Sequence, residues 1–207
     1  MIHSNSRENV MNCLVVIDPQ NDFCPGGALA VDDGNAIMPS INEMMATHDL
    51  VVLTQDWHPP GHGSFASSHQ EKAPLEMVDM PYGPQVLWPD HCIQGSKGAA
   101  FHPALDASKA SAIIRKGMNP EVDSYSAFFE NDKVTQTGLA GYLREVGCTH
   151  LTMVGLATDF CVAWSALDGA AQGFVVEVRL ASCRAIDFDG SLDTALENMC
   201  AAGVKLI

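Results

Sequence analysis

Short, continuous apolar runs recur along the chain and constrain its fold more than any other feature. They occupy residues 13–18, 50–55, 111–115, 150–154, 173–178 and 204–207. Runs of this length are typical of parallel strands that are buried on both faces. Stretches with helical spacing of apolar residues lie between them, at residues 34–47, 136–146, 162–171 and 190–202. The alternation predicts an α/β fold in which helices cover both faces of a mostly parallel sheet.

The 207 residues suffice for one domain with a full core. The net charge of −14 argues against a nucleic-acid or anionic-membrane surface, since both require Lys and Arg. Residues 1–11 are polar and unlike a signal peptide, and no apolar stretch is long enough to span a membrane. The seven cysteines are scattered without a C-x-x-C pair, which disfavours a disulfide framework and a structural zinc site. We predict a cytoplasmic protein with a polar extension at residues 1–11 and a single domain over residues 12–207.

Four of the predicted strands end at or beside a chemically reactive side chain. These side chains are Asp18, Asp56, Lys116 and Cys161. Ligands of open parallel sheets bind beyond the carboxyl ends of the strands, which meet at one edge. The coincidence predicts that the four side chains share one site.

Cys161 is predicted to lie in the first turn of a helix that follows a buried strand. Gly155 permits the turn, and Thr158 is the expected N-cap. Free backbone N–H groups and the helix dipole would lower the pKa of a thiol there, so that a thiolate forms near neutral pH. The alternative is a small buried apolar cysteine, which is the usual state of a free thiol.

A cysteine nucleophile requires a base and a cation, and two other strand ends can supply them. Asp18 can remove the thiol proton, while Lys116 can stabilise the thiolate and hold Asp18 in place. Backbone N–H groups of Ala157 and Cys161 would form an oxyanion hole at the helix start. Taken singly, Asp18 could be a turn residue before proline and Lys116 a solvated lysine. Their shared position at strand ends favours catalysis.

A second group of residues could bind a metal ion. Asp56 and His58 point the same way in an extended segment, and Pro59 favours that conformation at His58. Residues 57 to about 101 lack periodicity, and a loop of that length is usually functional. The candidates for a third ligand are His62, His69, His91 and His102. His91 is favoured by its aromatic and proline neighbours. Imidazole and carboxylate ligands suit Zn, Fe or Mn, and the alternative is a scatter of surface histidines.

Loop residues indicate what such a site could bind. None of the loop glycines sits in a context that cradles a nucleotide phosphate. Aromatic residues fall in loops near the predicted site, at Phe23, Trp88, Tyr125 and Phe128. Side chains of this type are more often core than pocket wall, although a flat aromatic substrate would require such walls.

Taken together, these motifs resemble the nicotinamidase family of isochorismatase-like cysteine hydrolases. The resemblance rests on Val-Val-Ile-Asp-Pro-Gln-Asn-Asp-Phe around Asp18, Gln-Asp-Trp-His at residues 55–58, Trp-Pro-Asp-His-Cys at residues 88–92, Lys116 before Gly117, and Gly-Leu-Ala-Thr-Asp-Phe-Cys at residues 155–161. It extends in order from residue 12 to residue 207.

The resemblance implies a three-layer Rossmann-like fold with a six-stranded, mostly parallel sheet flanked by helices. It implies hydrolysis of nicotinamide to nicotinate and ammonia in NAD salvage, with activity on pyrazinamide-like analogues. By position, Asp18 would be the general base and acid, Lys116 the thiolate stabiliser, and Cys161 the nucleophile that forms a thioester. A cis peptide between Leu156 and Ala157 is also implied.

For the metal, the resemblance implies one divalent Zn, Fe or Mn ion bound by Asp56, His58 and His91, in contact with the pyridine nitrogen. Some members of the family place a further ligand histidine where this chain has Ser64. A fourth ligand could therefore be Ser64 or water, with His62 a weaker option.

The same resemblance assigns side chains to the substrate. Phe23 and Trp88 would sandwich the ring, and Tyr125 and Leu156 would line the same site.

Three other functions stay open. Another amidase of the superfamily, such as an N-carbamoyl amidase, would not need the metal set. A non-haem iron oxygenase could use two histidines and a carboxylate, but it leaves Lys116 and Cys161 without roles. A non-enzymatic module would tolerate the loss of Cys161. The expected partner is a small molecule, without nucleic acid or membrane, and both a monomer and a homo-oligomer are compatible with the sequence.

Overall fold

The computed structural model describes residues 11–207, and its centre is a six-stranded sheet. The strands are β1 (Met11–Ile17), β2 (Leu50–Asp56), β5 (Ala112–Lys116), β6 (Cys148–Leu156), β7 (Val175–Arg184) and β8 (Lys205–Leu206). Their order is β5-β2-β1-β6-β7-β8, and every neighbouring pair is parallel. The predicted α/β fold with six strands is confirmed.

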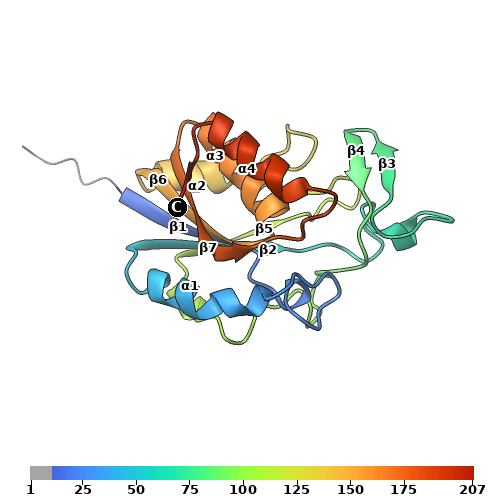
Figure 1. Cartoon of the computed structure of the whole chain (residues 1–207), viewed down its shortest axis with the longest axis horizontal. Coiled ribbons are helices and arrows are strands. Elements are labelled where there is room, and N and C mark those ends of the chain that lie inside the picture. Colours follow the sequence, from blue (N-terminus) through green and yellow to red (C-terminus); the bar gives the residue numbers. More distant parts are fainter. Residues whose placement is uncertain (1–10) are drawn as a thin grey trace, which may run out of the picture.

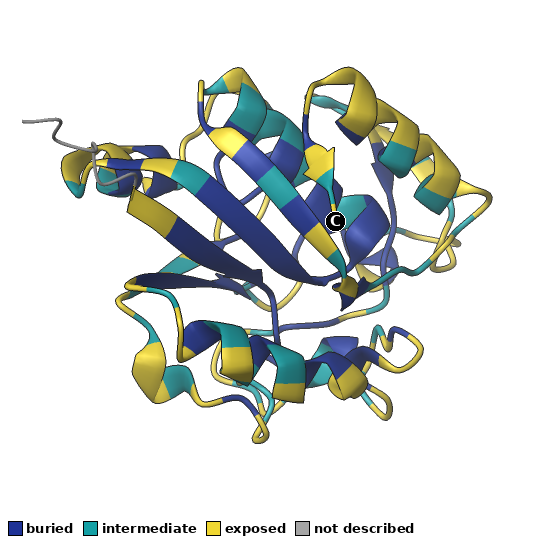
Figure 2. Cartoon of the chain, turned by 60° about the vertical axis from the view of Figure 1, so that its left-hand side comes forward, coloured by how far each residue is buried: buried dark blue, intermediate teal, exposed yellow. Residues whose placement is uncertain are grey.

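Helices cover both faces of this sheet (Figure 1). The helix α1 (Met38–Met45) packs on one face, and α2 (Leu139–Glu145), α3 (Ala163–Ala171) and α4 (Ser191–Ala201) lie on the other. All seven residues of β2 are buried, as are the last five of β1, while the outer faces of the helices are exposed (Figure 2). The apolar runs therefore form the central layer of a three-layer fold.

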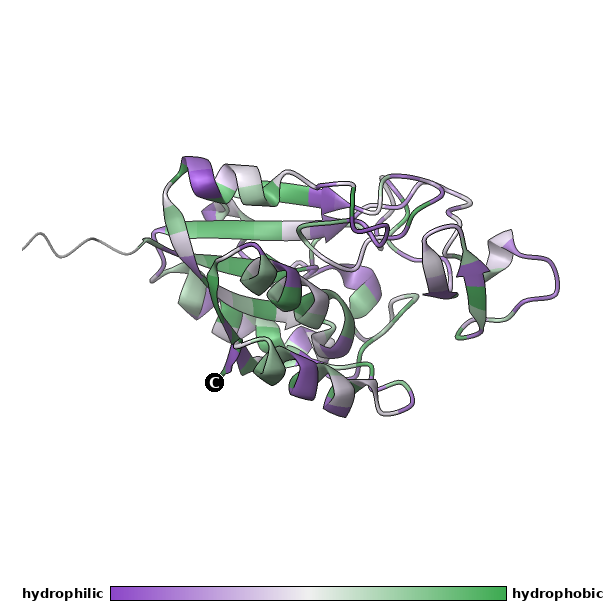
Figure 3. Ribbon diagram, turned by 90° about the horizontal axis from the view of Figure 1, so that it is seen from above, coloured by the Kyte–Doolittle hydropathy of each residue, from purple (hydrophilic) through white to green (hydrophobic). Residues whose placement is uncertain are grey.

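An antiparallel ribbon stands in the stretch for which the sequence predicted no regular structure. Its strands are β3 (Met77–Met80) and β4 (Gly83–Val86). The ribbon projects from the body on the side to which the arrows of the large sheet point (Figure 3). Each strand is only four residues long, too short to produce a clear periodic pattern.

Several predicted boundaries differ from the structure. The helix expected over residues 136–146 begins at Leu139, because Gly138 precedes it in the left-handed region at φ 97°. Residues 34–37 form a 3₁₀ turn before α1. Thr158 is not an N-cap: Ala157 takes that position, and residues 158–162 form a π-helical turn before α3.

The predicted extension, residues 1–11, lies outside the described residues except for Met11, the first residue of β1. That residues 12–207 form one domain stays a prediction. Within residues 11–207, no helix combines the length and apolar character needed to cross a bilayer.

Candidate active site

The register of the sheet brings the four strand ends together at one edge. Asp56 at the end of β2 pairs with Lys116 at the end of β5, and the last residue of β1, Ile17, pairs with Gly155 of β6. Asp18 follows β1 directly, and Cys161 follows β6 by one short turn. All four side chains are buried. The structure thus brings together the four side chains that the sequence analysis expected at one site.

Lys116 is the centre of this cluster. Its Nζ lies 2.9 Å from Asp18 Oδ2, 2.9 Å from Asp56 Oδ1 and 3.5 Å from Cys161 Sγ. It also donates to the carbonyl of Ser124 at 2.8 Å. Burial opposes the charge of Lys116, but the two carboxylates outweigh it and raise the pKa of the ammonium well above its usual value. The lysine is therefore a permanent cation between two acids and a thiol.

Asp18 is held firmly by its neighbour Thr54. The Thr54 hydroxyl donates to Asp18 Oδ1 at 2.6 Å and accepts the Asp18 backbone N–H at 3.0 Å. Asp18 has a left-handed φ of 45°, a conformation that costs free energy in a residue other than glycine and that often occurs at functional sites. Its other oxygen, Oδ2, accepts no hydrogen bond of good geometry from residues 11–207. Burial raises the pKa of the Asp18 carboxyl, which fits a group that takes up a proton.

Cys161 lies in the π-helical turn rather than in a regular helix start. The carbonyl of Ala157 accepts hydrogen bonds from the N–H groups of Phe160 and Val162. It accepts none from the N–H of Cys161, which lies between them in sequence. Burial, together with the carboxylates of Asp18 and Asp56, raises the pKa of the Cys161 thiol well above its usual value, although Lys116 lowers it. The prediction of a free thiolate is therefore wrong, because burial raises the pKa of the Cys161 thiol by more than a helix terminus would lower it. The thiol requires a base.

Asp56 belongs both to the lysine cluster and to a group of metal-ligand type. Its Oδ2 lies 3.0 Å from His58 Nε2 and 3.4 Å from His91 Nε2. Burial alone would raise the pKa of Asp56, but His58 and Lys116 overcome it and hold the pKa well below its usual value. Asp56 is therefore a carboxylate.

A backbone carbonyl orients each of the two histidine rings. His58 Nδ1 lies 3.0 Å from the carbonyl of Gly117, and His91 Nδ1 lies 2.8 Å from the carbonyl of Pro89. A carbonyl can only accept, so each Nδ1 donates its proton to that carbonyl, and each Nε2 faces the Asp56 carboxylate, where an ion could bind all three groups. Two imidazoles and one carboxylate that converge in this way fit a divalent transition metal.

A second set of possible ligand atoms shares His58. His62 and Asp123 lie with it in a group whose ligand atoms are within 4.8 Å of one another. His62 Nε2 contacts the Asn119 carbonyl at 2.8 Å, and its Nδ1 contacts the Ser64 hydroxyl at 2.8 Å. Since both ring nitrogens of His62 are engaged, this arrangement disfavours His62 as a ligand. Ser64 as a fourth ligand stays a prediction.

Aromatic side chains surround the two clusters. Phe23 meets the His91 ring edge-on at 5.6 Å, and Trp88 lies 6.2 Å from Tyr125. Leu156, fully buried, is joined to Ala157 by a cis peptide. Phe128 is different: it packs against Phe174 at 5.9 Å and belongs to the core.

Sequence reasoning missed the residues that support the cluster. Thr54 fixes Asp18, and Gln20 holds both backbone groups of Asp56, accepting its N–H at 2.8 Å and donating to its carbonyl at 2.8 Å. Asp159 accepts the N–H groups of Ile186 and Asp187, which ties the turn before Cys161 to the loop before α4. A hydroxyl inside an apolar strand was the available signal for Thr54. For Gln20 and Asp159 the only signal was their place inside the motifs around Asp18 and Cys161.

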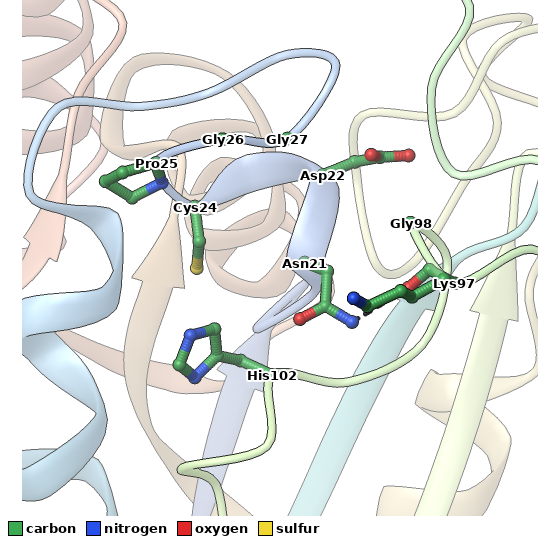
Figure 4. A pocket seen from close by; sticks show the side chains of 9 residues that line it. All are labelled: Asn21, Asp22, Cys24, Pro25, Gly26, Gly27, Lys97, Gly98 and His102. Carbon is green, nitrogen blue, oxygen red and sulfur yellow. Dashed lines mark hydrogen bonds between the residues drawn. The ribbon is translucent and has the colours of Figure 1, made fainter.

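A separate surface cavity of about 260 Å³ lies beside the turn at residues 21–27 (Figure 4). Cys24, Lys97 and His102 are among the residues around it. Of the residues considered for the site it contains only His102, a candidate third metal ligand that the structure does not place with Asp56 and His58.

Comparisons with known proteins agree with this geometry. The Isochorismatase domain family matches residues 12–207. The nicotinamidase of Acinetobacter baylyi is 53% identical over 197 residues, which cover 95% of this chain and 92% of that protein. The nicotinamidase of Escherichia coli is 41% identical over 198 residues, covering 93% and 92%.

Solved structures give the same result. A structure described as a nicotinamidase/pyrazinamidase of Acinetobacter baumannii has a TM-score of 0.95 and 51% identity, and covers 97% of each chain. A pyrazinamidase of Pyrococcus horikoshii in complex with zinc has a TM-score of 0.76 and 35% identity, covering 95% of this chain and 98% of that one.

Proposed function

The chain belongs to the isochorismatase domain family, and from that premise we propose that it hydrolyses nicotinamide to nicotinate and ammonia. The observation that carries the proposal is the contact of one ammonium, Lys116 Nζ, with Asp18, Asp56 and Cys161. Through this contact, Asp18 and Cys161, which suit acyl transfer, lie next to Asp56 of the metal-ligand group, which suits a pyridine nitrogen.

The first half of the reaction forms a thioester. Asp18 takes the proton of Cys161, and Lys116 stabilises the thiolate. The sulfur attacks the carboxamide carbon, and the oxyanion accepts hydrogen bonds from the N–H groups of Ala157 and Cys161. Asp18 then returns the proton to the amide nitrogen, the C–N bond breaks, and ammonia leaves.

The second half consumes water. Asp18 removes a proton from the water, whose oxygen attacks the thioester carbon, and the sulfur leaves and is reprotonated. Nicotinate is released, and the product would return to NAD synthesis. Pyrazinamide-like analogues have the same amide and a similar ring, so we expect them to react too.

Asp56, His58 and His91 would hold one divalent ion, and Phe23, Trp88, Tyr125 and Leu156 would contact the ring. The bound ion would act as a Lewis acid that orients the pyridine nitrogen. The zinc in the Pyrococcus relative supports a divalent ion at such a site. Zn, Fe and Mn all suit these ligands.

The test is ammonia release from nicotinamide by the purified protein. It should be lost after chelation and restored by Zn, Fe or Mn. Release that survives complete removal of metal would retain the Cys161 chemistry but contradict the metal's role. No release under any of the three metals would favour another amidase of the family.

A further inference from the structure

Gln85, near the end of β4, has a buried side-chain amide. Its side chain is 1% exposed. The ribbon projects from the body (Figure 3), yet the Gln85 side chain contacts Asp123 and Tyr125. The two regions that it touches are the aromatic wall, defined here as Trp88 and Tyr125, and the metal-ligand group.

Both ends of the amide are fully engaged. Oε1 accepts the Tyr82 hydroxyl and the Asn131 amide, each at 3.2 Å. Nε2 lies 2.8 Å from the Val86 carbonyl and 2.8 Å from Asp123 Oδ2, and both of these atoms can only accept. The neighbours therefore fix which end of the amide is nitrogen, and the side chain has a single arrangement.

The same nitrogen reaches the aromatic wall. It also lies 2.8 Å from the hydroxyl of Tyr125, so its two N–H groups are shared among three oxygens, and the same hydroxyl accepts the indole N–H of Trp88 at 3.1 Å. On the opposite side, Asp123 Oδ1 lies 4.0 Å from His58 Nε2. Hydrogen bonds thus link Trp88 through Tyr125 and Gln85 to Asp123, whose carboxylate lies within ion-pair distance of a metal-ligand imidazole.

We propose that Gln85 is a positioning residue that fixes the aromatic wall relative to the metal-ligand group. A flat heteroaromatic ring can contact a metal and the wall at once only if the two are in register. Buried hydrogen-bond networks favour such a unique arrangement, because a shift leaves a buried donor or acceptor without a partner. This inference rests on the proposed function, and it adds a residue outside the catalytic and metal groups.

The test measures coupling between metal and ring. In a Cys161→Ala background, nicotinamide affinity is determined by calorimetry with zinc bound and after chelation. The ratio of the two dissociation constants is the factor by which zinc tightens nicotinamide binding. Gln85→Leu should lower this factor by about tenfold, the effect of losing one buried polar partner. Gln70→Leu, the same change at an exposed position in the segment that joins β2 to β4, should leave it unchanged.

A second readout needs no ligand. The Trp88 indole N–H is bonded to Tyr125, so its hydrogen exchange, followed by NMR, reports directly on the wall. Exchange should accelerate in Gln85→Leu and stay slow in Gln70→Leu. If Gln85→Leu does not fold, Tyr82→Phe removes one partner of the amide at a half-buried position and should give smaller changes of the same sign.

Equal weakening of nicotinamide binding with and without zinc would overturn the proposal, since a merely structural residue acts on both states alike. So would an unchanged Trp88 exchange rate. If the Cys161→Ala parent binds no nicotinamide even with zinc, the proposed function fails instead. The exchange experiment then still decides whether Gln85 holds the wall.

Discussion

The site has two halves that are built in different ways. One half lies at the edge formed by the carboxyl ends of the parallel strands, and the other lies in the long segment between β2 and β5. At the edge, Asp18, Asp56 and Lys116 stand at or directly after the ends of the parallel strands β1, β2 and β5, and the strand register makes them neighbours. In the segment, His91, Trp88 and Gln85 are placed by side chain–backbone and side chain–side chain hydrogen bonds. The first half contains the proposed bond-breaking groups, and the second contains the groups proposed to hold the ring.

This difference predicts how each half responds to mutation. Strand ends cannot move without breaking the sheet, so substitutions there should alter chemistry or stability and leave the other half in place. The segment depends on many single hydrogen bonds, and substitutions there should alter affinity for metal or ring. Asp56 belongs to both halves, because one of its oxygens faces Lys116 and the other faces the histidines.

The largest effect is expected for Cys161→Ala. Turnover of nicotinamide should fall by at least about a thousandfold, because the nucleophile is lost while the other groups remain. Nicotinamide binding should stay measurable by calorimetry, because the ring contacts belong to the other half. Cys200→Ala, at an exposed cysteine, serves as the control. Near-normal turnover in Cys161→Ala would contradict the proposed mechanism.

Lys116→Met should destabilise the fold by about 3–5 kcal/mol, because two buried carboxylates lose their shared cation. Urea unfolding measures this, with Lys109→Met, at an exposed lysine, as the control.

Lys116→Met should also change the pH dependence of Cys161 alkylation. Lys116 lowers the pKa of the Cys161 thiol, so its removal should shift alkylation of Cys161 by iodoacetamide to higher pH. The thiolate is the reactive form and is present above the pKa, so at any fixed pH below it the variant should react more slowly. A shift of the alkylation profile to lower pH would show that the lysine does not stabilise the thiolate.

The two halves also differ in how far the sequence predicts them. The strand ends could be predicted because the apolar runs around residues 13–18 and 50–55 show where strands stop. In a parallel sheet these ends then meet at one edge. The pKa of Cys161 could not be predicted, because local sequence shows a helix start but not the burial that overrides it.

In the segment, four histidines were candidates; aromatic and proline neighbours favoured His91, and the resemblance to a family then assigned it. The ribbon was missed because each of its strands is only four residues long. Gln85 was missed because its contacts join residues some 40 positions apart, such as Gln85 and Tyr125, and a periodic pattern carries no such information.

A smaller effect is expected for His91→Ala. Affinity for zinc should fall by at least about 100-fold, since even outer contacts of a ligand are worth 10- to 100-fold. The KM for nicotinamide should rise more than kcat falls, because Cys161, Lys116 and Asp18 are intact. His69→Ala, another histidine of the same segment, whose Nε2 contacts the Gly63 carbonyl at 2.7 Å, should keep its metal. Equal loss of zinc in both variants would remove His91 from the ligand set.

The smallest effect is expected for Ser64→Ala, which asks how far the metal group extends into the segment. The hydroxyl is bonded to His62 Nδ1 at 2.8 Å and is neutral, so a water can take its place beside an ion. Zinc affinity should therefore fall by less than about tenfold, well short of the effect of losing an imidazole. Competition with a zinc chelator measures the difference, and Ser67→Ala, at an exposed serine three residues on, is the control. A loss as large as that of His91→Ala would make Ser64 a full ligand, and the metal group would then extend further into the segment.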